Sequence, residues 1–143
     1  MKRVLAGFIL GVLLGTWNVS FAENNVIEDK KAAAVVAAHN WLVLVDEGDY
    51  DLSWEESASY FKSLVTKESW HQTIAAIRSP LGKVLARELK EVTYTTSLPG
   101  APDGKYIVIQ FSTSYAQKAE AIETITRMKD EDGYWRISGY FIR

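Results

Sequence analysis

The sequence of 143 residues contains no cysteine. Without thiols the chain forms no disulfide bond and has no cysteine nucleophile, so its stability has to come from a packed core. Only two histidines are present, His39 and His71, whereas a zinc site usually takes three or four ligands at regular spacing. The sequence also lacks a Gly-x-Ser-x-Gly motif and a glycine-rich phosphate-binding loop. We therefore expect neither a metal nor a cofactor.

The sequence has no surplus of positive charge either. Its 16 lysines and arginines are scattered among 18 carboxylates, and the net charge is −2. Binding to phosphate backbones requires a concentrated basic face. We therefore expect no nucleic-acid partner.

A long hydrophobic run is missing, because the apolar residues 4–14 fall short of the roughly 20 that a membrane-spanning helix needs. This run follows Lys2 and Arg3 and precedes small residues at positions −3 and −1 of a cleavage site after Ala22. The layout is typical of a secretory signal peptide. We predict that residues 1–22 are removed on export; a retained anchor, the alternative, fits the short run and its interior glycines less well.

Export would leave residues 23–143 as a single domain in the periplasm or outside the cell, with no stable membrane anchor. The lost segment carries two cations and no carboxylate, so the net charge of the remainder is −4. About 120 residues are enough for one hydrophobic core.

Residues 32–45 are apolar at nearly every position, which predicts a helix buried around most of its circumference. Asp29 is positioned to cap its first turn, and Gly48 to end it in a left-handed conformation. Two groups of carboxylates are explained by helix-end or hairpin-turn duties rather than by catalysis: Asp46, Asp49 and Asp51, and Asp130, Glu131 and Asp132.

Two further helices follow. Ser53 and Glu56 form a Ser-x-x-Glu capping box that predicts the start of the second helix. Its apolar stripe consists of Trp54, Ala58, Phe61 and Val65. The third helix starts at Thr66 and ends near Pro80 and Gly82. Its stripe consists of Trp70, Ile74, Ile77 and Leu81.

The second half of the chain is rich in β-branched and aromatic residues, in runs of about ten separated by turn-forming residues. The predicted strands cover residues 85–98, 105–115, 119–129 and 134–142. Short connections predict an antiparallel meander, and hence an α+β fold with three N-terminal helices on one face of a four-stranded sheet. Both faces of the sheet carry apolar residues, so part of the second face is expected to form a dimer interface or to line a pocket.

Several short motifs are spread along the chain, and their combination is distinctive. They are Trp41-Leu42, Asp46-x-Gly48-x-Tyr50, Ser53-Trp54, Trp70, Arg78-Ser79-Pro80-Leu81-Gly82, Arg87, Leu98-Pro99-Gly100-x-Pro102-Asp103-Gly104-x-Tyr106, Glu123, Asp132-Gly133-x-Trp135-Arg136 and Gly139-Tyr140-Phe141-Ile142-Arg143. In this combination the chain resembles the bacterial domain-of-unknown-function family 4019. The resemblance implies a curved, cone-shaped fold similar to nuclear transport factor 2 and ketosteroid isomerase, and it implies no established activity.

In cone folds the cavity lies between the sheet and the helices, where a few convergent polar groups would bind a ligand. The polar candidates are Arg78, Arg87 and Glu123. The aromatic candidates for the pocket edge are Trp54, Tyr60, Trp70 and Tyr140. Arginines in such a pocket would favour an anionic ligand through forked hydrogen bonds.

The alternative is structural: Arg78 or Arg87 pairs with Glu123 and ties a helix to the sheet, while the aromatic residues form core. Glu123 is also the one strand carboxylate with apolar neighbours that would suit proton transfer.

We therefore expect an exported, non-catalytic module that binds a small ligand or an envelope protein, neither of which the sequence identifies. The alternatives are a small enzyme, with isomerase-like or dehydratase-like proton transfer by a cavity carboxylate, and a homodimeric structural protein.

Overall fold

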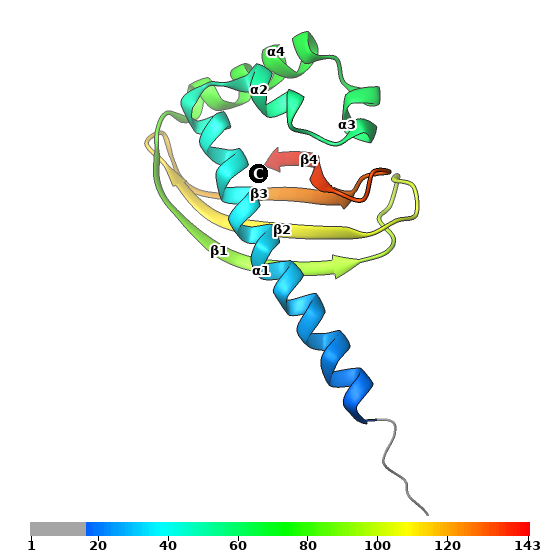
Figure 1. Cartoon of the computed structure of the whole chain (residues 1–143). Helices are drawn as coiled ribbons and strands as arrows, with labels where there is room; N and C mark the ends of the chain where they lie inside the picture. The colour runs from blue at the N-terminus through cyan, green and yellow to red at the C-terminus, as the bar shows by residue number, and fades with distance from the viewer. Residues whose placement is uncertain (1–16) are drawn as a thin grey trace, which may run out of the picture.

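The computed structural model describes residues 17–143, in which the helices come first and the strands second (Figure 1). The helices are α1 (Trp17–Glu47), α2 (Tyr50–Glu55), α3 (Ser59–Leu64), α4 (Lys67–Arg78) and the short 3₁₀ helix η1 (Ser79–Leu81). The strands are β1 (Val84–Thr95), β2 (Tyr106–Tyr115), β3 (Lys118–Lys129) and β4 (Trp135–Ile142). The predicted α+β fold is confirmed.

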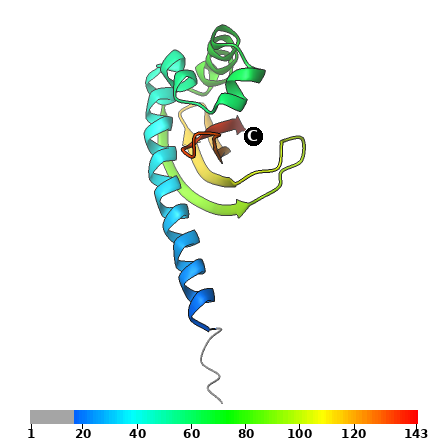
Figure 2. The same cartoon turned by 45° about the vertical axis from the view of Figure 1, so that its right-hand side comes forward.

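The four strands form one open antiparallel sheet in the order β1-β2-β3-β4. The pairing shifts register at Lys90 of β1 and at Ser138 of β4, and such bulges bend a strand. The strands are curved, α1 crosses one face of the sheet, and α2 to α4 gather at one end of it (Figure 1, Figure 2). This arrangement fits the expected cone shape.

The core lies between α1, α4 and the face of the sheet that we call the inner face. Alternate residues of β2 and β3 point into it, because side chains along a strand alternate between the two faces. The sheet contributes Ile107, Ile109, Phe111, Ile125 and Ile137, and the helices contribute Ala34, Ala38, Trp41, Leu42, Val45, Phe61, Trp70 and Ile74. The chain thus buries one continuous apolar cluster, as a domain without disulfides requires.

Helix α1 is longer and more exposed than predicted. Asp29 lies inside the helix instead of capping it, and no side chain from position 20 to position 33 is buried. Beyond that point, Val36 and Val43 remain 62% and 47% exposed. The prediction of burial on most sides is therefore wrong, because the sheet covers only one side of α1. Its end is as predicted: Gly48 adopts a φ of 83°, a conformation that favours glycine.

The predicted second helix is divided in two, and Ser53 does not cap it. Helix α2 begins earlier, after Asp49, and Ser53 lies buried within it. The chain then leaves the helix at Ser57, which forms a bridge to Ile137 in β4, where the amide of Ala58 donates to the Ile137 carbonyl at 2.7 Å. A contact with the sheet therefore interrupts a stripe that is continuous in the sequence.

Helix α4 follows the prediction in its bounds and its cap, but Ile77 of the predicted stripe is 43% exposed and Arg78 is buried instead. The hydroxyl of its N-cap, Thr66, accepts a hydrogen bond from the Ser69 amide at 3.2 Å. At the other end, Pro80 is the second residue of η1, and Gly82 turns the chain into β1 with a φ of 73°. A side chain at Gly82 would also meet Ala116 at 3.1 Å, so both backbone conformation and space require glycine there.

The predicted signal peptide lies mostly outside the described residues, and its last residues, 17–22, form the start of α1. Cleavage after Ala22 stays a prediction. Within residues 17–143 no helix is long and apolar enough to cross a membrane.

Candidate functional site

Four charged side chains from four different elements meet between the helices and the inner face of the sheet. Asp46 comes from the last turns of α1, Arg78 from the end of α4, Arg87 from β1 and Glu123 from β3. We call this set the charge cluster. It brings together three of the residues that the sequence nominated and adds Asp46, so the cluster is balanced at two positive and two negative charges.

Glu123 is the most deeply placed member, with 0% of its side chain exposed. Its Oε1 accepts a hydrogen bond from Arg87 Nε at 2.7 Å and another from the Thr113 hydroxyl. Its Oε2 accepts from Arg87 Nη2 at 3.2 Å and from the Tyr140 hydroxyl. Burial alone would raise the pKa of Glu123, but Arg87 and the two hydroxyls outweigh burial and hold the pKa below its usual value.

Asp46 closes the cluster on its more exposed side. Its Oδ1 accepts from Arg78 Nη2 at 2.8 Å and from Arg87 Nη2 at 3.0 Å, and its Oδ2 accepts from Arg87 Nη1 at 2.8 Å. Burial raises the pKa of Asp46, yet both arginines favour the charged form and leave its pKa lowered. Arg87 therefore bridges Asp46 and Glu123, and its own pKa is raised by both carboxylates against the effect of burial.

Arg78 is less completely paired than Arg87. It is buried, its Nε and Nη1 have no hydrogen-bond partner among the described residues, and its guanidinium lies over the ring of Tyr115 at 5.2 Å. The buried hydroxyl of Tyr115 also lacks a partner there. Burial, with the charge of Glu123 as the next cause, raises the pKa of Tyr115 to about 12. Burial and the charge of Glu123 also raise the pKa of Tyr140 above the usual range. Tyr140 therefore stays a neutral hydrogen-bond donor.

The aromatic candidates do not all surround one cavity. Trp70 packs against Trp41 and Phe61, with ring centroids 6.1 and 5.2 Å apart, and Trp41 in turn packs against Tyr140 at 5.4 Å. The indole nitrogens of both tryptophans bond to Ser53. This part of the helix–sheet interface is therefore filled by aromatic rings.

The two other aromatic candidates lie away from the charge cluster. Trp54 donates to the Val65 carbonyl at 2.7 Å and carries the ammonium groups of Lys62 and Lys67 over its ring. Tyr60 reaches the Gly100 carbonyl in the loop after β1, at 3.5 Å. Both residues help to hold the short helices in place.

A hollow of about 700 Å³ opens next to the charge cluster. Its walls come from the ends of α1 and α4 and from the starts of α2, η1 and β1. They are Val45, Asp46, Tyr50, Ala75, Arg78, Ser79, Gly82, Lys83 and Val84. We call it the Asp46 hollow. Its volume lies within the range of small-molecule pockets, and its lining mixes apolar groups with the Asp46–Arg78 pair.

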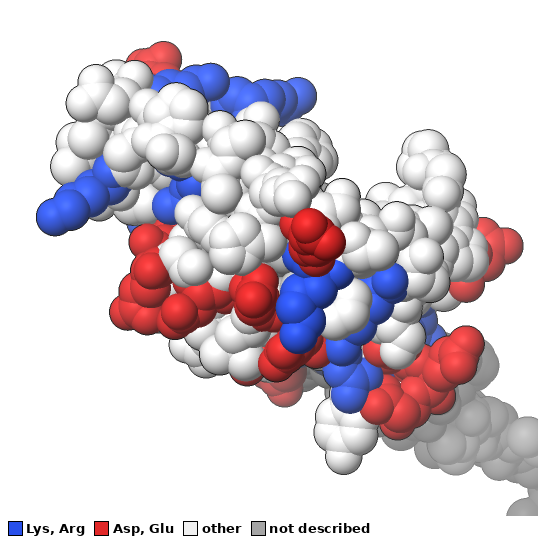
Figure 3. Space-filling view, turned by 90° about the horizontal axis from the view of Figure 1, so that it is seen from above, with Lys and Arg blue, Asp and Glu red and all other residues white. Residues whose placement is uncertain are grey.

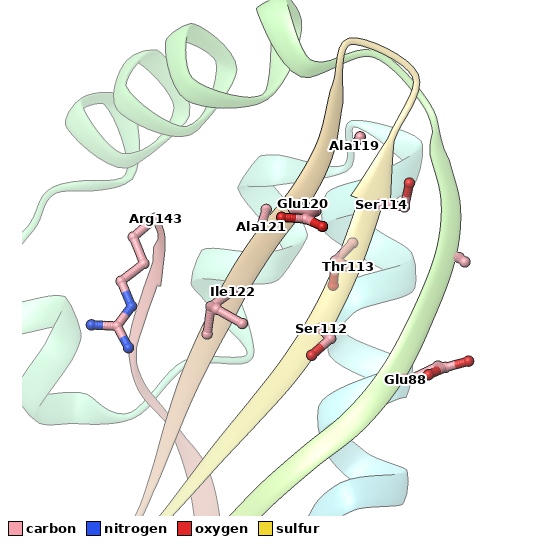
Figure 4. Close-up of a pocket in the computed structure, with 10 residues that line it drawn as sticks. Glu88, Ser112, Thr113, Ser114, Ala119, Glu120, Ala121, Ile122 and Arg143 are labelled. Carbon is pink, nitrogen blue, oxygen red and sulfur yellow. The ribbon is translucent and has the colours of Figure 1, made fainter.

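A second hollow, of about 460 Å³, lies on the other face of the sheet. Small side chains such as Ser112 and Ser114 leave a depression that Glu88, Glu120 and Arg143 border (Figure 4). This is part of the second face that the sequence predicted to be an interface or a pocket lining.

The charged surface is mixed. In the view from the helical end, basic and acidic groups lie next to each other (Figure 3). Arg136, for example, bonds to Asp132 at 2.8 Å and to Asp130 at 3.1 Å, and Asp130 also accepts from the Ser59 amide at 3.0 Å. The carboxylates of the last hairpin thus hold the turn and the start of α3 in place.

Sequence reasoning missed two members of the site, Asp46 and Thr113. Asp46 was assigned to the helix end, although it follows the buried Leu42 by one helical turn and shares its face. Thr113 occupies an inner position of β2, opposite Arg87 in the sheet register. To find these two residues, one must know how α1 packs on the sheet and how the strands pair. No local sequence motif contains that information.

The site's chemistry follows from its hydrogen bonds. Glu123 has both oxygens occupied and a lowered pKa, so it is a weak base and is not an acid at neutral pH. Within residues 17–143 no group of three or more metal-binding side chains comes together. The cluster links α1 and α4 to two strands, β1 and β3. It corresponds to the structural alternative that the sequence left open, with Arg87 as the partner of Glu123 and with Asp46 as the residue that ties the helices to the sheet.

The structure defines an α+β domain whose helices are joined to the sheet by a buried, balanced charge cluster. The chain belongs to the family described as "Protein of unknown function (DUF4019)", whose model matches residues 37–140. The matched segment contains all four members of the charge cluster. No curated protein matches the sequence.

Proposed function

We propose that this protein is an exported, non-catalytic binding module of the cell envelope that holds a small ligand in the Asp46 hollow. One observation carries the proposal: the hollow opens against a charge cluster whose buried carboxylate is already neutralised. Asp46 and Arg78, the two cluster members that line the hollow, are paired with each other, so this wall presents fixed polar groups to a ligand and no unpaired carboxylate.

The enzyme alternative needs a carboxylate that can accept or release a proton near neutral pH. Glu123 was the candidate, and its bonds to Arg87, Thr113 and Tyr140 stabilise the charged form. A catalytic role would require those bonds to break on substrate binding. The geometry therefore favours binding over proton transfer.

The ligand class follows from the lining. Asp46 and Arg78 neutralise one another at 2.8 Å, and Lys83 adds an exposed ammonium group. Tyr50, Val45 and Val84 supply apolar surface. We infer a small amphipathic molecule that carries one negative charge.

We also assign the fold to the superfamily of nuclear transport factor 2 and ketosteroid isomerase. The curved four-stranded meander with helices on one face supports this assignment. The superfamily hosts several functions, so it does not choose one for this chain.

Native mass spectrometry of the protein purified from its own cell compartment tests the binding function. We expect a co-purifying small molecule on the wild type and on Ala76→Trp, and its loss from Ala75→Trp. Ala75 lines the hollow, whereas its neighbour Ala76 is exposed and lies outside the lining. Absence of any bound molecule, or equal retention by both variants, would contradict the proposal.

Self-association is the second candidate, and the surface of α1 favours it. Val26, Val36 and Val43 are 50%, 62% and 47% exposed, and together with Ala33 they lie near one face of the helix. Light scattering of the wild type and of Val36→Lys/Val43→Lys tests this candidate. A wild-type dimer that the double variant converts to a monomer supports it, and a wild-type monomer rejects it.

A further inference from the structure

Arg127 is an arginine of the inner face without a carboxylate partner. It lies in β3 between Ile107 of β2 and Ile137 of β4. Its Nη2 donates to the Trp135 carbonyl at 2.7 Å. Within residues 17–143 no carboxylate lies within 4.0 Å of its nitrogens, whereas Arg78, Arg87 and Arg136 each form an ion pair.

Partial burial of an unneutralised guanidinium is unfavourable, since buried charges in proteins are normally paired. Burial lowers the pKa of Arg127, and no neighbouring charge offsets it. The charge remains in place, because an arginine does not lose its proton near neutral pH. An anion beside Arg127 would neutralise the guanidinium and remove this unfavourable free energy of burial.

Arg127 also has donors to offer. A guanidinium carries five N–H groups, and only the bond to Trp135 is formed within the described residues. None of its nitrogens is among the buried atoms without a partner, so the remaining donors are open to solvent. They can reach an incoming ligand without any rearrangement of the core.

Arg127 lines a hollow of about 210 Å³ between α1, the end of α2 and the β3–β4 hairpin. The other lining residues are Ala37, Asn40, Trp41, Glu56, Trp135, Arg136 and Ile137. Asn40 is exposed, and its side-chain amide has no partner within residues 17–143, so it is a second donor. Trp41, Trp135 and Ile137 supply apolar walls. This hollow shares no lining residue with the Asp46 hollow.

We propose that this hollow, which we call the Arg127 hollow, is a binding site for a small organic monocarboxylate. The carboxylate would accept hydrogen bonds from the guanidinium of Arg127 and the amide of Asn40, and its short apolar body would lie against the tryptophans. The hollow is smaller than the roughly 300–1,000 Å³ of drug-sized pockets, which limits the ligand to a few heavy atoms.

The charges around the hollow favour a monoanion over a dianion. Arg136 is held by Asp130 and Asp132, so Arg127 supplies the one uncompensated positive charge of the lining. Glu56, exposed at the rim, repels any anion and repels a dianion more strongly than a monoanion. A phosphate dianion would thus remain partly unneutralised against apolar walls.

Titration with sodium propionate, followed by NMR of the Arg127 Nε–H and the Asn40 amide, tests the proposal. Sodium chloride keeps the ionic strength constant, and propionamide serves as the uncharged analogue. We expect a saturable shift of both resonances with propionate and none with propionamide. Equal responses to propionate and chloride, or no saturation, would overturn the proposal.

Three variants test whether Arg127 itself binds the carboxylate of propionate. Arg127→Met should weaken propionate binding by about tenfold or more, because it removes the charged donors. Arg127→Lys should weaken it less, since it keeps the charge but loses the fork. Glu56→Gln should bind at least as tightly as the wild type, because a like charge leaves the rim. Unchanged affinity in Arg127→Met, or weaker affinity in Glu56→Gln, would contradict the site; if Arg127→Met does not fold, the wild-type titration and Arg127→Lys decide.

Discussion

Arg87 donates hydrogen bonds to both oxygens of Glu123, at 2.7 and 3.2 Å, and to both oxygens of Asp46, at 2.8 and 3.0 Å. One side chain of β1 thereby joins the last turns of α1 to the middle of β3. Both carboxylates are stabilised as anions, and the junction of helices and sheet is fixed. The energetic consequences of this junction are measurable.

Glu123→Ala should lower the free energy of unfolding by about 3–5 kcal/mol, because it leaves Arg87 partly buried with a single remaining acid partner. Urea unfolding measures the change. Glu120→Ala is the matched control: Glu120 lies on the same strand but is exposed, and we expect a change within about 0.5 kcal/mol. Equal effects of the two substitutions would show that the buried bonds of Glu123 contribute little.

Stability should fall in acid because of the same two carboxylates. Asp46 and Glu123 have lowered pKa values in the folded protein, so their stabilisation is complete above the ordinary values of 3.8 and 4.5. It is lost as the pH falls below these values towards the folded pKa values. Unfolding free energies measured from neutral pH downward should decline more steeply for the wild type than for Glu123→Gln. Parallel curves would exclude Glu123 as a source of the acid sensitivity.

The small side chain of Ser53 should contribute strongly to the stability of the folded protein. Its hydroxyl accepts from Trp70 Nε1 at 2.9 Å and donates to the Tyr50 carbonyl at 2.7 Å, while its carbonyl accepts from Trp41 Nε1. Ser53→Ala leaves the Trp70 donor buried without a partner, which costs about 1–3 kcal/mol. Thermal unfolding beside Ser63→Ala, an exposed serine with a similar local bond, checks this. A loss no larger than that of Ser63→Ala would refute the role.

The sequence predicted most elements of this fold and the antiparallel order of its strands, and it missed particular contacts between the helices and the sheet. Helix α4 and its cap at Thr66 could be predicted because the signals are contiguous. The division between α2 and α3 could not, because it depends on the bond from Ala58 to Ile137 in a distant strand. Similarly, the sequence left open whether Arg78 or Arg87 pairs with Glu123, and the structure pairs Arg87 with it. Asp46 joins them only through the packing of α1 on the sheet.

Export makes a separate prediction about the N-terminus. Mass spectrometry of the protein from the envelope fraction should give a mature chain that begins at Glu23. Such a chain would retain the exposed Val26, Val36 and Val43 on a shortened α1. Detection of residues 1–22 on the purified protein, or its recovery from the cytoplasm alone, would contradict the predicted signal peptide.

The protonation of Glu123 decides between a structural carboxylate and a catalytic one, and carboxyl-detected NMR measures it directly. A pH titration of the folded protein, with Glu123→Gln to assign the resonance, yields the pKa of this one group. We expect a midpoint below the ordinary value of 4.5, because Arg87, Thr113 and Tyr140 stabilise the anion. A midpoint near about 6–7, where a general acid or base operates, would contradict a non-catalytic binding module and favour an enzyme.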